Sequence, residues 1–203
     1  MRTHARRVAV IVFDEVELLD VAAPLEVLSA AGRRWNFRPF KLELLAPRAG
    51  LVTTRNQTRL EATGELAQAA PAEVVIVPGG YGARRLAEAP ADLAELTRIA
   101  TGAELVAAVG NGVLALARAG LCGSERIAVS SELATELEGA IDRAACDTTA
   151  RLVEGTRVLT ATATGSALEL GLAIIRRTFG SKMVSLVAAE LGLDTKEVLE
   201  IRY

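Results

Sequence analysis

A tight glycine turn separates an apolar run from an alanine- and leucine-rich segment within residues 104–121 (ELVAAVGNGVLALARAGL). A strand that turns sharply into a helix is the nucleophile-elbow arrangement, which raises one side chain above the sheet edge and directs backbone amides at it. Gly110 or Asn111 occupies the raised position, and neither residue is a nucleophile. Glycine also has a purely structural reason to stand there, because it tolerates a positive φ and close packing. The sequence therefore predicts the scaffold of a catalytic site without its attacking atom.

Two other segments could contribute to the same site. Asp20 follows the first apolar run, and Gly79, Gly80 and Tyr81 follow a later one. Asp20 is either a helix cap or a pocket carboxylate, and desolvation beside the elbow would raise its pKa and make it a general acid or base. The two glycines are either a simple turn or a source of free amides for an anionic or carbonyl ligand. Tyr81 is expected to line the pocket, and Glu17 is expected to face solvent.

The elements that must position these residues alternate between strands and helices. Apolar runs and periodicity predict strands at residues 8–13, 40–45, 51–60 (a short hairpin or a pair of edge strands), 74–77, 105–109, 127–129, 152–153 and 158–161. Helices are predicted after the elbow and at residues 22–31, 90–100, 166–178 and 181–191. This alternation predicts one α/β domain over residues 1–203: a flavodoxin-like, doubly wound, mostly parallel sheet with helices on both faces. Asp20, the glycine turn and the elbow should converge at the carboxyl ends of its strands.

Charge, cysteine spacing and the length of the apolar runs exclude several classes of function. The chain has 203 residues and a net charge of −2, which gives no electrostatic footprint for nucleic acid or an anionic membrane. Cys122 and Cys146 lack metal-ligand spacing, and no apolar run reaches the length of a membrane span. We therefore expect a cytoplasmic globular protein with no metal and no cofactor, and with neither a nucleic acid nor a membrane as partner.

Five segments in order resemble the ThiJ/PfpI superfamily, which has a class I glutamine amidotransferase-like fold and includes the isonitrile hydratases. The segments are residues 13–14, 19–20 with 24–27, 77–80, 109–121 and 160–180. The resemblance covers nearly the whole chain and implies a homodimer. It also implies that Asp20 is the acidic residue that meets the nucleophile, and that the amides of the glycine turn help to form an oxyanion hole.

The departures from the family pattern fall on the chemistry. The family's cysteine aligns with Gly110, because Gly112, Gly120 and Leu121 fix the register without a gap. The next residue, usually threonine or asparagine, is Asn111, and the histidine often found after the elbow aligns near Ser131. Cys122 lies at the far end of the elbow helix, so it cannot replace the missing thiol.

The sequence thus predicts a protein that has lost its cysteine chemistry and binds a small polar or carbonyl-bearing molecule in the former active-site pocket. The expected ligand-binding residues are Gly79, Gly80, Tyr81, Gly110, Asn111, Gly112 and Ser131. The alternative is a thiol-independent hydratase or isomerase, similar to the isonitrile hydratases. In that reading Asp20 is the acid or base, and the elbow and glycine-turn amides hold developing negative charge. A regulatory sensing domain is a third reading, weakened because the sequence shows no helix-turn-helix region.

Overall fold

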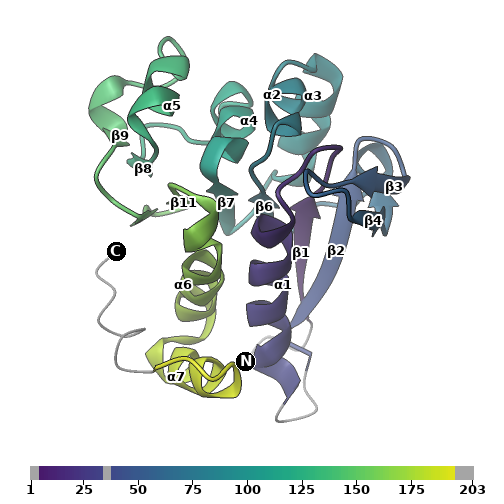
Figure 1. Ribbon diagram of the computed structural model, residues 1–203, viewed down its shortest axis with the longest axis vertical. Coiled ribbons are helices and arrows are strands. Elements are labelled where there is room, and N and C mark those ends of the chain that lie inside the picture. Colours follow the sequence, from purple (N-terminus) through teal and green to yellow (C-terminus); the bar gives the residue numbers. More distant parts are fainter. Residues whose placement is uncertain (1–4, 34–37, 195–203) are drawn as a thin grey trace.

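A seven-stranded sheet forms the centre of the computed structural model, which describes residues 5–33 and 38–194 (Figure 1). Its strand order is β10-β11-β7-β6-β1-β2-β5. The strands are β1 (Arg6–Ile11), β2 (Phe40–Ala46), β5 (Gly64–Glu65), β6 (Val74–Val77), β7 (Leu105–Val109), β10 (Leu152–Glu154) and β11 (Val158–Ala161). The pairings within it are parallel except that β10 runs antiparallel to β11. The predicted α/β fold class is confirmed.

The helices cover both faces because the chain reverses its direction across the sheet. It steps from β1 outward to β2, and later from β6 the opposite way to β7. Right-handed crossovers then place the connecting helices on opposite sides. The burial of every residue of β6 and β7 fits this double cover. The helices are α1 (Leu18–Arg33), α2 (Gly82–Ala87), α3 (Pro90–Ile99), α4 (Val113–Arg118), α5 (Ser131–Glu136), α6 (Ala167–Phe179) and α7 (Ser181–Glu190).

Helices α1 and α6 lie side by side in front of the sheet (Figure 1). A glycine permits their close approach, since a Cβ atom at Gly171 would lie 2.9 Å from Cβ of Val27. The N-terminus of α1 and the loop before α6 consequently reach the same edge of the sheet. This edge carries the carboxyl ends of β1, β6, β7 and β11.

Smaller elements lie outside the main sheet. The predicted hairpin is present as β3 (Gly50–Thr53) and β4 (Arg59–Ala62), which pair antiparallel. The strand predicted at 127–129 exists as β8 (Ile127–Ala128), but it pairs with β9 (Cys146–Asp147) in a separate two-stranded sheet. Short 3₁₀ turns occur at η1 (Leu66–Gln68), η2 (Gly110–Gly112), η3 (Arg143–Ala145) and η4 (Thr164–Ser166).

One boundary bears directly on the site. Helix α1 begins at Leu18, four residues before its predicted start, so Asp20 lies in its first turn instead of in the preceding loop. Pro24 therefore lies inside the helix. Because proline has no N–H, it cannot donate to the carbonyl of the residue four positions earlier, and a proline in a sequence favours a later helix start. Among the residues that the structure describes, no helix combines the length and apolar character needed to cross a membrane.

The packing of the elbow gives a stability prediction. A Cβ atom at Gly112, in η2, would lie 2.3 Å from the Val77 carbonyl oxygen, whereas one at exposed Gly165, in η4, would meet nothing within 4 Å. We expect Gly112→Ala to lower the free energy of unfolding by about 1–3 kcal/mol, the usual cost of overpacking. The matched control Gly165→Ala should stay within about 0.5 kcal/mol of the wild type. Urea unfolding measures both, and equal losses would contradict the tight contact between η2 and the end of β6.

Candidate functional site

Three loops are joined by backbone hydrogen bonds at the carboxyl edge of the sheet. The loop after β1 meets the glycine turn after β6, where the Glu17 amide donates to the Gly79 carbonyl (2.9 Å) and Val16 forms an antiparallel bridge with Gly80. The β3–β4 hairpin joins them through the Arg55 amide, which donates to the Val16 carbonyl (3.0 Å). The predicted convergence of the first loop and the glycine turn is therefore present, and the hairpin is an addition.

Both the backbone conformation and the lack of space require glycine at Gly80, and lack of space requires it at Gly82. Gly80 has a φ of 127°, and a Cβ atom there would lie 2.3 Å from the Glu15 carbonyl oxygen. A Cβ atom at Gly82 would lie 2.0 Å from the Asp14 carbonyl oxygen. Any side chain at either position would push the loop after β1 away from the turn. These glycines explain why the sequence after β6 reads PGGYG.

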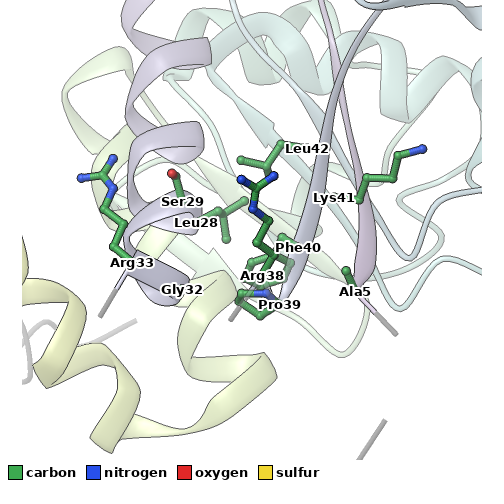
Figure 2. A pocket seen from close by; sticks show the side chains of 10 residues that line it. All are labelled: Ala5, Leu28, Ser29, Gly32, Arg33, Arg38, Pro39, Phe40, Lys41 and Leu42. Atoms are coloured by element: carbon green, nitrogen blue, oxygen red, sulfur yellow. The ribbon is translucent and has the colours of Figure 1, made fainter. Parts of the chain in front are cut away.

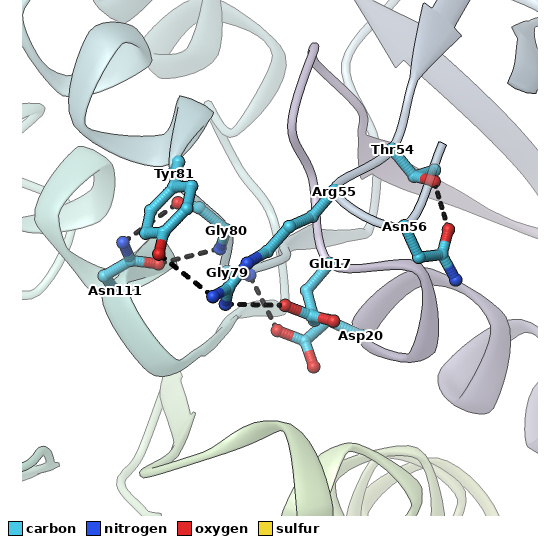
Figure 3. Close-up of polar contacts among 9 residues, drawn as sticks. All are labelled: Glu17, Asp20, Thr54, Arg55, Asn56, Gly79, Gly80, Tyr81 and Asn111. Atoms are coloured by element: carbon cyan, nitrogen blue, oxygen red, sulfur yellow. Dashed lines mark hydrogen bonds and ion pairs between the residues drawn. The ribbon is translucent and has the colours of Figure 1, made fainter. Parts of the chain in front are cut away.

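Asp20 is the buried carboxylate of the site, with 1% of its surface exposed. Its Oδ2 accepts a hydrogen bond from the Gly79 amide at 2.9 Å (Figure 3). Its Oδ1 is also buried and makes no hydrogen bond of standard geometry with any residue that the structure describes. The helix-cap reading of Asp20 is wrong, because the amide that it accepts from lies 59 residues away and not in its own helix. One carboxylate oxygen is left for another partner.

Burial raises the pKa of Asp20 to about 6. The charge of Glu17 also raises this pKa, while the Gly79 amide and the hydroxyl of Thr164, in η4, lower it. Near neutral pH both forms of the carboxyl group are accessible. The protonated form can donate a hydrogen bond, and the ionised form can accept one or take a proton.

Asn111 clamps the glycine turn. Its Oδ1 accepts from the Gly80 amide and its Nδ2 donates to the Gly80 carbonyl, both at 2.9 Å (Figure 3). Since the Gly79 amide is bound to Asp20, both amides of the turn already have partners. The expectation that they are free for a ligand is wrong. The site supplies its own acceptors, a carboxylate from α1 and a carboxamide from η2.

Gly110 is the first residue of η2, directly after β7, and has a φ of 52°. A Cβ atom there would find only the Thr162 carbonyl oxygen within 4 Å, at 3.9 Å. The left-handed backbone explains why glycine suits this turn, and the contact shows that a side chain would have room. The first backbone N–H groups of a helix have no hydrogen-bond acceptor within that helix. At the elbow these N–H groups belong to residues Gly110–Gly112.

The elbow and the carboxylate meet at one point. A Cβ atom added at Gly79 would lie 2.8 Å from Asp20 Oδ2, 3.0 Å from the Val109 carbonyl oxygen and 3.1 Å from Asn111 Oδ1. The structure thus brings Asp20, Gly79, Gly80 and Asn111 together, with Gly110 and Gly112 in the same turn as Asn111.

A stacked group of three side chains, Glu17, Arg55 and Tyr81, borders these residues (Figure 3). The Arg55 guanidinium carbon lies 4.2 Å from the centre of the Tyr81 ring, Nη2 donates to Tyr81 Oη (3.0 Å), and Nη1 lies 3.4 Å from Glu17 Oε2. The expectation that Glu17 faces solvent is only half met, because its side chain is 28% exposed. Sequence reasoning missed Arg55, whose only signal was its place in a polar hairpin loop.

Ser131 is not joined to this cluster. It is the exposed first residue of α5, and the neighbouring Ser130 caps that helix by accepting from the Leu133 amide at 3.2 Å. No hydrogen bond or ion pair among the described residues connects Ser131 with Asp20 or Asn111. Its assignment as a ligand-binding residue stays a prediction.

The two thiols lie away from the elbow turn. Burial raises the pKa of Cys122 to about 12, and burial also raises the pKa of the half-buried Cys146. Neither group has the low-pKa environment of a reactive thiolate. Within residues 5–33 and 38–194, no three His, Cys, Asp or Glu side chains are placed to hold a metal ion.

Three hollows lie elsewhere on the described surface. One of about 690 Å³ lies between the end of α1 and the start of β2, where Leu28, Arg33 and Phe40 line it (Figure 2). It is at the amino end of β2, opposite the edge that carries Asp20. Two others border α5 and β10, and none of the three is lined by Asp20, Gly79 or Asn111.

Comparison with known proteins gives a consistent result. The DJ-1/PfpI family matches residues 6–177, and no curated protein sequence matches the chain significantly. The VC2308 protein has a similar structure, with a TM-score of 0.81, 22% identity and coverage of 97% of this chain and 98% of that one. A ThiJ/PfpI family protein from Pseudomonas syringae has a TM-score of 0.80 and 20% identity, with coverage of 94% of this chain and 76% of that one. DJ-1beta from Drosophila melanogaster has a TM-score of 0.79 and 22% identity, with coverage of 94% of this chain and 99% of that one. At these identities the structures establish the fold.

The raised pKa of Asp20 predicts how stability changes with pH. A carboxyl group with a folded pKa of about 6 and an ordinary value of 3.8 stabilises the fold below pH 3.8, and this contribution is lost as the pH rises through 6. The loss is about 3 kcal/mol for a shift of about 2 pKa units. We therefore expect Asp20→Asn to be more stable than the wild type at pH 8, by up to about 3 kcal/mol, and the gain to vanish near pH 4.

Chemical unfolding at several pH values measures this difference. The control is Asp142→Asn, because Asp142 is an exposed cap of η3 and asparagine caps as well as aspartate. The control should leave stability unchanged. A gain for Asp20→Asn that is the same at pH 4 and pH 8 would show that the carboxylate is not desolvated.

Proposed function

The chain belongs to the DJ-1/PfpI family, and we propose that it binds a small, uncharged polar molecule, such as a carbonyl compound, between Asp20 and the elbow. The binding is non-covalent, because position 110 carries no nucleophile. Gly110 leaves the space that a side chain would occupy, and Asp20 supplies the hydrogen-bonding group beside it.

The observation that carries this proposal is the buried Oδ1 of Asp20, which makes no hydrogen bond of standard geometry with the described residues. A buried polar atom without a partner costs about 1–3 kcal/mol, and a ligand that forms the missing hydrogen bond recovers that cost. Protonated Asp20 would donate from Oδ1 to a carbonyl oxygen, and ionised Asp20 would accept from a hydroxyl or an amide. The same atom serves both kinds of ligand.

Charge favours a neutral ligand. Asp20 and Glu17 contribute two carboxylates, and Arg55 contributes one guanidinium, which is already paired with Glu17. An anionic ligand would meet excess negative charge whenever Asp20 is ionised. The amides of Gly79 and Gly80 offer it no donors, because both are bound to side chains.

A second candidate is thiol-independent hydration or isomerisation, and the pKa of about 6 for Asp20 favours it. A group with this pKa can exchange a proton at neutral pH, which contributes ~10²–10⁴-fold to a rate. Water beside Gly110 would be the nucleophile in hydration. The oxyanion hole in this version can use only elbow amides, because those of the glycine turn already have partners.

The family also leads us to propose a homodimer and a cytoplasmic location. Leu19 and Leu51 are exposed by 52% and 62%, and Tyr81 by 54%. Leu19 adjoins Asp20 and Tyr81 adjoins Gly80, so apolar surface borders the site. This surface supports an interface near the site.

Native mass spectrometry of protein purified from its own host tests ligand binding. Wild type, Asp20→Ala and the control Asp142→Ala are prepared identically. We expect an additional small-molecule mass on the wild type and the control. Its occupancy on Asp20→Ala should fall in line with an affinity loss of about 5- to 100-fold, corresponding to one hydrogen bond. Full retention by Asp20→Ala would contradict the role of Asp20.

Acetamide provides a measurement that does not depend on the natural ligand. Titrated into ¹⁵N-labelled protein, this neutral carbonyl compound should shift the amide signals of Gly79 and Asn111 in the wild type and much less in Asp20→Ala. Absence of these shifts in the wild type, together with absence of a co-purified mass, would overturn the proposed binding site. Conversion of the co-purified compound by the wild type, lost in Asp20→Asn, would favour the enzyme over the binder.

A further inference from the structure

Hydrogen-bond acceptors gather where Asp20 meets the elbow. A Cβ atom added at Gly79 would have three oxygens as its nearest atoms, all within 3.1 Å: Asp20 Oδ2, the Val109 carbonyl oxygen and Asn111 Oδ1. These oxygens come from α1, from the end of β7 and from η2. A fourth oxygen, the Thr162 carbonyl, follows β11 and borders the elbow from the other side. The described residues therefore present this point to a ligand mainly as a set of acceptors.

The donors beside these oxygens are largely used within the protein. The Gly79 amide donates to Asp20 Oδ2 and the Gly80 amide donates to Asn111 Oδ1, each at 2.9 Å. The Thr164 hydroxyl also acts on the Asp20 carboxyl group. An ionised carboxylate has about four acceptor positions, and an amide oxygen has two. Acceptor positions thus remain open on both side chains after these donors are counted.

Asp20 Oδ1 gains most from a further donor. This atom is buried and makes no hydrogen bond of standard geometry with the described residues. A buried acceptor without a partner is costly, so a ligand that supplies an N–H or O–H group to it binds favourably. A ligand with only a carbonyl group would instead place an oxygen against the ionised carboxylate. Such an unmatched contact discriminates against that ligand.

We propose that the site recognises the –NH2 group of a primary carboxamide, which donates to Asp20 Oδ1 and to the acceptor oxygens beside it. The inference rests on the proposed function and narrows its ligands from polar or carbonyl-bearing molecules to primary amides. One amide nitrogen carries two N–H donors, whereas a hydroxyl group has one and a ketone has none. Room for the group exists beside Gly110, where a Cβ atom would find only the Thr162 carbonyl oxygen within 4 Å.

An uncharged amide suits both forms of Asp20, whose pKa of about 6 makes both accessible near neutral pH. The ionised form accepts from the amide N–H, and the protonated form donates to the amide carbonyl. A protonated amine would serve only the ionised form. The Arg55 guanidinium, stacked on the Tyr81 ring, also places a cation at the border of the site already (Figure 3).

Acetamide and acetone test the proposal, because acetone has the shape of acetamide with a methyl group in place of –NH2. Each is titrated into ¹⁵N-labelled wild type at pH 8, where Asp20 is mostly ionised, and the amide signals of Gly79 and Asn111 are followed. We expect acetamide to bind at least about 5-fold more tightly than acetone, the effect of one hydrogen bond. Methylammonium, titrated in the same way, should bind more weakly than acetamide.

Asp20→Asn exchanges the acceptor for a donor. The Gly79 amide continues to require an oxygen at the position of Oδ2, so the –NH2 group of the asparagine takes the position of Oδ1. The preference for acetamide over acetone should therefore disappear in this variant. The matched control is Asp142→Asn, an exposed position in the cap of η3, and it should keep the wild-type preference.

Equal affinities of the wild type for acetamide and acetone would overturn the proposal, and so would tighter binding of methylammonium than of acetamide. A preference for acetamide that persists in Asp20→Asn would overturn the assignment of Asp20 Oδ1 as the acceptor. Equal affinities would leave the proposed binding site standing, whereas the absence of shifts with all three compounds would count against the site itself.

Discussion

The hydrogen bond from the Gly79 amide to the Asp20 carboxylate fixes the site, and the neighbouring elements are shaped to allow it. Gly79 must lack a side chain, since a Cβ atom would lie 2.8 Å from Asp20 Oδ2. Helix α1 must begin at Leu18 to carry Asp20 in its first turn. Gly171 lets α6 pack closely on α1, which brings Thr164 to the same carboxyl group. One buried acceptor thus determines where two helices and a turn can lie.

The sequence predicted the fold because its strands are continuous apolar runs and their order along the chain requires parallel crossovers. It also indicated Asp20, the glycine turn and the elbow, because glycines that directly follow an apolar strand mark a tight turn that can be recognised from the local sequence. Local patterns did not reveal that the Gly79 and Gly80 amides are bound by Asp20 and Asn111, because these partners are distant in sequence. Arg55 was missed for the same reason: nothing near it in sequence indicates Tyr81 as a stacking partner.

Glycine at position 110 bears on the chemistry of the acid beside it. A carboxyl group beside a thiol would have a proton donor or acceptor opposite it, whereas Asp20 Oδ1 makes no hydrogen bond of standard geometry with the described residues. Burial without such a partner favours the neutral form and moves the pKa into the physiological range. Asp20 is therefore suited to reversible hydrogen bonding or proton exchange, and the elbow carries little backbone strain because glycine accepts a φ of 52°.

A group with a pKa close to the ambient pH responds to nearby charges. A carboxylate with an ordinary pKa would stay ionised at neutral pH whether Glu17 were neutralised or not. Asp20, with a pKa of about 6, changes its protonated fraction severalfold for a shift of half a unit. Glu17 supplies such a charge and raises the pKa of Asp20 further, whereas its exposed contact with Arg55 contributes little to folding.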